Sequence, residues 1–193
     1  MVDVTRPARV LGIVGSPRKQ GNTERLTDAL LSGAKSAGLQ TEKILLSEYE
    51  IGHCHGCLTC YPDGSARCTV HDDQMPTIVE RMKRADVWVL ATPIYCYGPT
   101  SLFKAFLDRW IALLPQVHAR TRAAALLPLN QAAPGADPTL AMLRTTLRSF
   151  NIPFLGERVF PGLLHLGDLD RHEDYVEEAA SFGREIAEHA IAG

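Results

Sequence analysis

Residues 10–23, VLGIVGSPRKQGNT, decide the fold of this chain, because they lead from a buried strand into a loop and then into a helix. Val10 to Gly15 is a short apolar run of the kind that forms a strand buried on both faces. Asn22 or Thr23 is the expected N-cap of the helix, which carries an apolar stripe and ends at Gly38. The stretch therefore predicts a β–loop–α unit.

The same alternation continues along the chain. Apolar runs predict further strands at 41–46, 86–92, 123–127 and 158–160. Amphipathic patterns predict helices at 75–82, 99–114, 138–150 and 173–190. Pro99 fits the first turn of its helix, because that position needs no N–H donor. Strict alternation of buried strands and helices implies a parallel sheet with right-handed crossovers and helices on both faces.

Five such units predict an α/β protein with a single flavodoxin-like, doubly wound, five-stranded parallel sheet in the order 2-1-3-4-5. No internal repeat or linker interrupts the pattern. Residues 1–193 are therefore expected to form one flavodoxin-like domain, with a cysteine-rich insertion at about 51–72. In this strand order the chain reverses direction between strands 1 and 3, so a ligand is expected on the loops that follow those two strands.

The composition is that of an ordinary globular protein. Its 193 residues are 46% apolar and 22% charged, with a net charge of -2 and mixed signs along the chain. This balance argues against nucleic-acid and membrane-surface partners. No apolar run reaches the roughly 18 residues of a membrane span, and residues 1–10 lack the apolar region of a signal peptide. A cytoplasmic protein with reduced thiols is expected.

The first loop has the side chains of a phosphate site. Ser16 and Thr23 offer hydroxyl donors, Asn22 offers an amide donor, and Arg18 offers a charge. Gly21 allows a close backbone approach at the start of a helix, where free N–H groups attract an anion. The loop matches neither a Walker sequence nor the dinucleotide glycine pattern, so it predicts a site for a terminal monophosphate. A well-capped turn without a ligand is the alternative.

The second loop, TPIYCYGPT at 92–100, follows the third predicted strand. Tyr95 and Tyr97 can offer aromatic faces to a planar ring, and Pro93 and Gly98 restrict the loop. The alternative is that the tyrosines cover the edge of the sheet. Because both loops fall at the predicted crevice, they favour one shared binding site.

GSPRKQGNT at 15–23 and TPIYCYGPTSLFKAFLDR at 92–109, with cysteine-rich sequence between them, resemble the NADPH-dependent FMN reductase family, which includes iron–sulfur flavoproteins. The resemblance implies an FMN cofactor and a third FMN loop at 130–135. It also implies that the chain forms a homodimer or homotetramer. The implied phosphate contacts are Ser16, Arg18, Asn22 and Thr23. The implied isoalloxazine contacts are Pro93, Ile94, Tyr95, Tyr97 and Gly98.

The same resemblance implies an NAD(P)H-dependent FMN oxidoreductase that passes electrons to a quinone, a flavin or another small acceptor. The flavin carries the chemistry, so no catalytic triad is expected. No residue can be assigned to the ribose 2′ position, so the sequence does not distinguish NADH from NADPH as the donor. The alternative is an iron–sulfur flavoprotein electron carrier that exchanges single electrons between FMN, a [4Fe–4S] cluster and a redox protein partner. A binding or regulatory domain on the same fold is a third hypothesis.

Four of the five cysteines form the motif Cys54-x2-Cys57-x2-Cys60-x7-Cys68. Three interpretations stay open. The motif has the ligand count of a [4Fe–4S] cluster. The cysteines could equally be free thiols beside a substrate loop. Zinc is the third interpretation, with further candidate ligands at His53, His55 and His71. The fifth cysteine, Cys96, is expected to be a small apolar filler.

Overall fold

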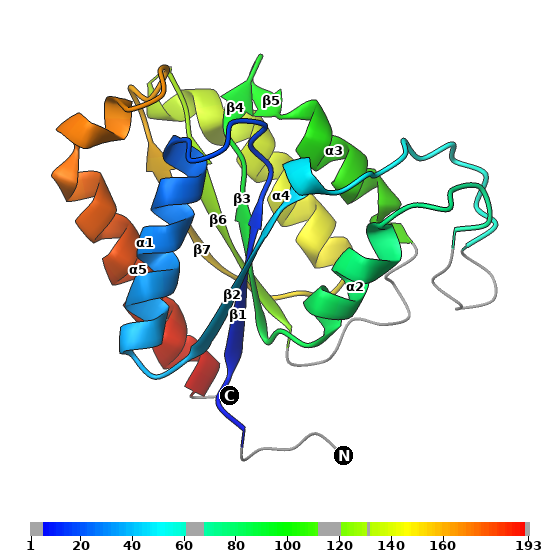
Figure 1. Cartoon of the computed structure of the whole chain (residues 1–193), viewed down its shortest axis with the longest axis horizontal. Helices are drawn as coiled ribbons and strands as arrows, with labels where there is room; N and C mark the ends of the chain where they lie inside the picture. The colour runs from blue at the N-terminus through cyan, green and yellow to red at the C-terminus, as the bar shows by residue number, and fades with distance from the viewer. Residues whose placement is uncertain (1–5, 61–67, 112–120, 131, 192–193) are drawn as a thin grey trace.

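The computed structural model describes residues 6–60, 68–111, 121–130 and 132–191. Its centre is a parallel sheet of five strands in the order β2-β1-β3-β6-β7, shown in Figure 1. These strands are β1 (Arg9–Val14), β2 (Gln40–Leu45), β3 (Val87–Ala91), β6 (Arg122–Pro128) and β7 (Phe154–Phe160). Since β6 and β7 are the fourth and fifth strands of this sheet along the chain, the predicted order 2-1-3-4-5 is confirmed.

Helices cover both faces of the sheet, as predicted (Figure 1). They are α1 (Asn22–Ser36), α2 (Met75–Lys83), α3 (Ser101–Asp108), α4 (Asp137–Ser149) and α5 (Glu173–Ile191). α1 and α5 pack on one face, where Leu26, Leu30 and Phe182 lie against Val87 and Val89. The other three helices share a second core on the opposite face. Successive strand residues point to opposite faces, so β1, β3 and β6 each contribute to both cores.

α1 and α5 approach closely because glycine occupies the contact on each helix. A Cβ atom on Gly33 would lie 1.9 Å from the carbonyl oxygen of Ala180. A Cβ atom on Gly183 would lie 2.0 Å from the carbonyl oxygen of Leu30. Any larger residue would force the helices apart.

The segment before α3 differs from the prediction. Pro99 lies in a short antiparallel hairpin made of β4 (Ile94–Tyr95) and β5 (Gly98–Pro99), so its predicted place in the first helical turn is wrong. Thr100 is the N-cap instead, because its Oγ1 accepts a hydrogen bond of 3.1 Å from the Phe103 N–H. α3 ends at Asp108, and the predicted helix end at 114 lies outside the described residues.

Other boundaries shift modestly. The N-cap of α1 is Gly21, not Asn22 or Thr23 as predicted. β7 begins at Phe154, earlier than the predicted strand at 158–160, because its half-buried residues at this sheet edge do not form an apolar run. Short 3-10 helices at Leu46–Glu48, Ala133–Ala136 and Asp168–Arg171 have no counterpart in the prediction.

Trp110 follows α3 and is buried in the core. It is 1% exposed and packs edge-on against Trp88, with ring centroids 5.5 Å apart. The apolar side of this segment therefore fills the interior. None of the helices in the described part of the chain combines the length and apolar character needed to cross a bilayer.

Candidate functional site

A pocket of about 340 Å³ opens at the carboxyl ends of the parallel strands. We name it the strand-end pocket. Segments that follow β1, β3, β6 and β7 line it, and the two predicted loops meet there. The lining residues are Ser16, Arg18, Asn22, Thr23, Pro93, Ile94, Tyr95, Cys96, Pro128, Leu129, Asn130, Leu163 and Leu164. The topological switch point therefore carries the pocket, as the strand order predicts.

The first loop ends at a helix terminus whose N–H groups are available. The first backbone bond of α1 runs from the Arg25 N–H to the Gly21 carbonyl, at 3.0 Å. Gly21 has no side chain to cap the helix, so the N–H groups of Asn22, Thr23 and Glu24 have no acceptor within it. The positive end of the helix dipole adds to their attraction for an anion. This arrangement suits a phosphate.

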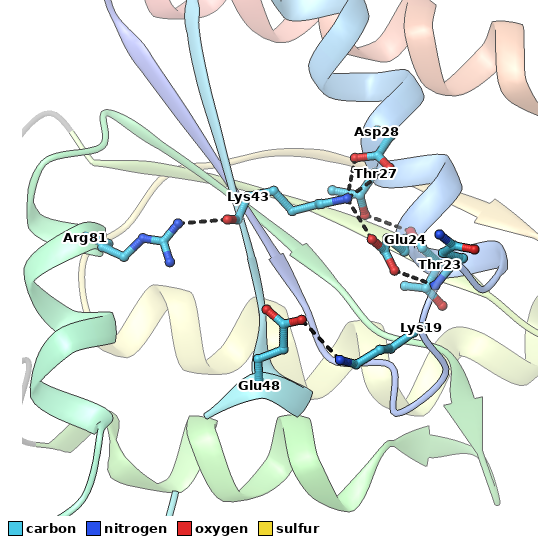
Figure 2. Close-up of polar contacts among 9 residues, drawn as sticks. Lys19, Thr23, Glu24, Thr27, Asp28, Lys43, Glu48 and Arg81 are labelled. Atoms are coloured by element: carbon cyan, nitrogen blue, oxygen red, sulfur yellow. Dashed lines mark hydrogen bonds and ion pairs between the residues drawn. The ribbon is translucent and has the colours of Figure 1, made fainter. Parts of the chain in front are cut away.

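Glu24 places a carboxylate in this same helical turn, and Figure 2 shows how its charge is balanced. Lys43 on β2 donates to Glu24 Oε1 at 2.8 Å and to Asp28 Oδ1 at 2.7 Å. The Gln20 N–H donates to Glu24 Oε2 at 2.6 Å. Burial alone would raise the pKa of the Glu24 carboxyl, but these hydrogen bonds outweigh burial and hold the pKa below its ordinary value. Glu24 is thus ionised and paired with Lys43. The positive charge of Lys43 offsets the repulsion that the Glu24 carboxylate would exert on a bound anion.

Two further contacts in Figure 2 fix the surroundings of this network. The Arg81 guanidinium on α2 donates to the Lys43 carbonyl oxygen at 2.8 Å. Lys19 in the first loop lies 3.4 Å from the Glu48 carboxylate. The loop is therefore tied to β2 and the turn that follows it.

The segment after β7 forms a pocket wall that the sequence did not predict. Arg18 Nη1 donates to the Leu164 carbonyl oxygen at 2.6 Å, and Asn22 Nδ2 donates to the His165 carbonyl oxygen at 2.9 Å. Leu163 and Leu164 line the pocket. No local sequence signal marks this segment, because its contacts join residues more than 140 positions apart.

The second loop is a strained hairpin. Cys96 and Tyr97, the two residues between β4 and β5, have φ angles of 50° and 63°. Two-residue hairpins of this kind usually contain Asn-Gly, since bulky residues disfavour positive φ. The turn presents Tyr95, which is 41% exposed, at the pocket. Tyr97 is 59% exposed and, like Gly98, is not among the lining residues.

The expected third loop at 130–135 is only partly described. Asn130 lines the pocket together with Pro128 and Leu129 at the end of β6. Residue 131 lies outside the described residues. Residues 133–136 form a 3-10 helix that leads into α4.

A second cavity, of about 100 Å³, lies at the far end of α3, and we name it the cysteine cavity. Cys54, Cys57, Cys60 and Cys68 all line it, together with Arg109. Cys57 has its pKa lowered by the hydrogen bond with Thr59, whereas burial raises the pKa of Cys60. Within the described residues, no three such side chains are arranged so as to hold a metal ion.

Of the three histidines in this region, His71 contacts the other two. The His71 Nε2 atom lies 2.7 Å from the His53 carbonyl oxygen, and the His71 ring packs edge-on against His55. His55 alone of the three lines the cavity. The histidine contacts therefore serve the local chain conformation.

The doubly wound sheet, with a pocket at its switch point, defines a flavodoxin-like α/β domain. A model of the family described as NADPH-dependent FMN reductase matches residues 8–161, and the chain belongs to that family. It is an NAD(P)H-dependent FMN oxidoreductase. The resemblance found in the sequence is confirmed.

The chain is also similar to two iron-sulfur flavoproteins and to one solved structure. It is 29% identical to an iron-sulfur flavoprotein of Archaeoglobus fulgidus, over 93% of this chain and 79% of the relative. It is 38% identical to an iron-sulfur flavoprotein of Methanocaldococcus jannaschii, over 52% of this chain and 51% of the relative, so that match spans about half of each protein. An NAD(P)H:quinone oxidoreductase from Methanothermobacter marburgensis superimposes with a TM-score of 0.76 and 16% identity, over 94% of this chain and 98% of the other. The last comparison shows the shared fold.

The strand-end pocket fits the FMN that the family implies. The uncapped helix terminus suits a phosphate, and Pro93, Ile94 and Tyr95 offer an apolar and aromatic wall to a ring. A further sign is the Asn22 Oδ1 atom, which is buried and has no hydrogen-bond partner among the described residues. A buried polar atom of this kind indicates that a ligand completes the site.

Proposed function

We propose that this chain takes electrons from NAD(P)H through FMN in the strand-end pocket and passes them to a small acceptor such as a quinone or a flavin. The observation that carries the proposal is that both loops predicted from the sequence line the same pocket. The residues that would hold the phosphate are Ser16, Arg18, Asn22 and Thr23. The residues that would contact the isoalloxazine are Pro93, Ile94, Tyr95, Tyr97 and Gly98.

Bound FMN supplies a two-electron acceptor that can release its electrons singly or in pairs. The part of the chain is to hold the cofactor and to leave one side accessible. Because the flavin would carry the chemistry, this proposal requires no acid–base pair from the protein. The exposed Tyr95 and Leu164 leave room at the rim for a second ligand.

The same proposal includes one domain over residues 1–193, with a cysteine-rich insertion at 51–72, and a homodimer or homotetramer. Second copies would cover the exposed Tyr97 and Leu166 near the pocket. A cytoplasmic location is also proposed. The five cysteines are unpaired thiols, which accords with a reducing compartment.

Reconstitution tests this function. Purified protein should bind FMN and then oxidise NADPH or NADH steadily when a quinone is supplied. A protein that takes up no FMN, or that binds FMN without oxidising either nicotinamide, would contradict the proposal.

A second candidate is an iron–sulfur flavoprotein that passes single electrons from FMN to a redox protein partner. Two observations favour it: Cys54, Cys57, Cys60 and Cys68 line one cavity, and the relatives named above are called iron-sulfur flavoproteins. Four thiols match a [4Fe–4S] cluster in kind and number. Their present arrangement is not that of a metal site, so this candidate requires the segment to rearrange around a cluster.

Metal analysis separates the two candidates. Anaerobically purified protein should contain about four iron and four sulfide per chain if the second holds. Cys57→Ser should then lose both, while Cys96→Ser, the matched control at the strand-end pocket, should keep them. Protein that contains FMN without iron or sulfide favours the first candidate. One zinc per chain would contradict the [4Fe–4S] cluster of the second.

A further inference from the structure

We propose that Asn22 recognises the ribityl chain of the flavin through its Oδ1 atom, and that residues 161–168 hold the side chain in the required orientation. This inference rests on the proposed function, since it requires FMN in the strand-end pocket. It gives Asn22 a different role from the phosphate donor that the sequence suggested.

The orientation of the Asn22 amide follows from its neighbour. Nδ2 donates to the His165 carbonyl oxygen at 2.9 Å. A flipped amide would place Oδ1 against that carbonyl oxygen, and two acceptors repel each other. Oδ1 is therefore the atom left for the pocket. It is buried without a donor among the described residues, on a side chain that is 9% exposed.

The chemistry of Oδ1 selects the part of the ligand that it can bind. An amide oxygen only accepts hydrogen bonds, and so do the oxygens of a phosphate dianion. A phosphate therefore leaves Oδ1 unsatisfied. The ribityl chain carries hydroxyl donors and lies between the phosphate and the ring. Asn22 opens α1 at the phosphate end, away from the hairpin that would contact the ring, so a ribityl hydroxyl is the donor that fits.

Asp168 fixes the His165 carbonyl from the other side. Its Oδ2 accepts the N–H groups of His165 at 2.6 Å and Leu164 at 2.9 Å. These bonds, first that from His165, hold the pKa of the Asp168 carboxyl below its ordinary value. Gly167, with a φ of 88°, allows the tight turn between them. Asp168 thus acts as a positioning residue. Its carboxylate holds the N–H of His165, and its own N–H donates to the His165 carbonyl that orients Asn22, at 3.3 Å.

Two contacts secure the segment against the rest of the pocket. The Leu163 N–H donates to the Leu129 carbonyl at the end of β6, at 2.9 Å. Arg18 Nη1 holds the Leu164 carbonyl at 2.6 Å. The wall that orients Asn22 is therefore anchored to the sheet and to the first loop.

Three flavins test the inference, because they differ only in the groups in question. FMN carries phosphate and ribityl, riboflavin carries ribityl alone, and lumiflavin carries neither. Dissociation constants are measured by quenching of flavin fluorescence. Asn22→Ala should weaken FMN and riboflavin by the same factor, about tenfold for one lost hydrogen bond, and should leave lumiflavin within about twofold. Ser36→Ala, which removes a hydrogen bond at the opposite end of α1, should change none of the three.

A loss confined to FMN would assign Asn22 to the phosphate and overturn the inference, as would an equal loss for all three flavins. Wild-type protein that binds none of them would instead refute the proposed function.

Asp168 gives an independent test with Asn22 intact. Asp168→Ala should weaken FMN and riboflavin by about threefold, whereas Asp168→Asn, which keeps an acceptor for the two N–H groups, should restore most of the affinity. Equal affinities in both variants and wild type would contradict the positioning role. Thermal unfolding identifies any variant that fails to fold. The flavin affinities of the variants that do fold then test the positioning role of Asp168.

Discussion

The strand-end pocket and the cysteine cavity lie at the two ends of α3, and they are held in shape by different means. The pocket is built by four segments that each follow a strand, so the sheet fixes where every wall begins. The described residues that line the cysteine cavity come from 54–60 and 68–70, outside the sheet, and from the end of α3 and the residues that follow it. One buried ion pair joins the two ends of the cysteine-rich region, at Gly52 and Asp73.

That ion pair is formed by Arg109 and Asp73. Arg109 is 5% exposed, and its Nη1 donates to Asp73 Oδ2 at 2.6 Å and to the Gly52 carbonyl at 2.9 Å. Asp73 also accepts the N–H groups of Gly52 and Met75. Burial would raise the pKa of the Asp73 carboxyl, but the hydrogen bonds from Arg109 and these N–H groups hold the pKa low. The pocket is thus preorganised by the fold, whereas the described part of the cysteine segment is held by this pair and by local hydrogen bonds, such as those that join Glu50 to Gln74 and Thr59 to Thr69.

The largest effect is expected from breaking that pair. Arg109→Met should lower the free energy of unfolding by about 3–5 kcal/mol, because it leaves the Asp73 carboxylate buried without its cation. Urea unfolding measures the loss. Lys104→Ala removes the exposed pair with Asp108 on the same helix and should cost less than about 1 kcal/mol. A similar loss of unfolding free energy in both variants would show that other contacts hold Gly52 and Asp73 together.

A smaller loss is expected at the opposite end of α3. Thr100 Oγ1 donates to the Gly15 carbonyl at 2.5 Å while it caps the Phe103 N–H, and both bonds are buried. Thr100→Val should therefore lower the free energy of unfolding by about 2 kcal/mol. It should also weaken FMN binding, since Gly15 leads into the first loop. Ser149→Ala is the control, because it removes an exposed hydrogen bond at the end of α4. An unchanged FMN affinity would separate the helix cap from the pocket.

The smallest effect concerns acid. The folded-state pKa of Glu24 lies below its ordinary value of 4.5, so its contribution to stability is complete above pH 4.5 and is lost as pH falls through the lower folded value. Glu24→Gln should therefore flatten the decline in stability between about pH 5 and pH 3. Urea unfolding across that range measures the slope. A slope that is the same in Glu24→Gln as in the wild type would show that the pairing of Glu24 does not stabilise the fold.

The sheet could be predicted because its three central strands, β1, β3 and β6, are buried apolar runs and because strands alternate with amphipathic helices along the chain. The pocket could be predicted because loops after β1 and β3 must meet at the switch point. The wall at 161–168 could not, since a hydrogen bond from Asn22 to His165 leaves no trace in either local sequence. The hairpin before α3 was missed for another reason: Cys96 and Tyr97 are unusual turn residues, and only the folded context holds them at positive φ.

α3 has a consequence for how the length of this protein can vary. Each added residue advances a helix by about 1.5 Å and turns it by about 100°. A single insertion between Ser101 and Asp108 would rotate Arg109 away from Gly52 and Asp73, although Thr100 could stay on Gly15. Natural insertions and deletions should therefore be rare within this helix. They should be found in loops, where an added residue does not rotate the segments on either side. The length of α3 therefore fixes both the distance between the two sites and their relative orientation about the helix axis.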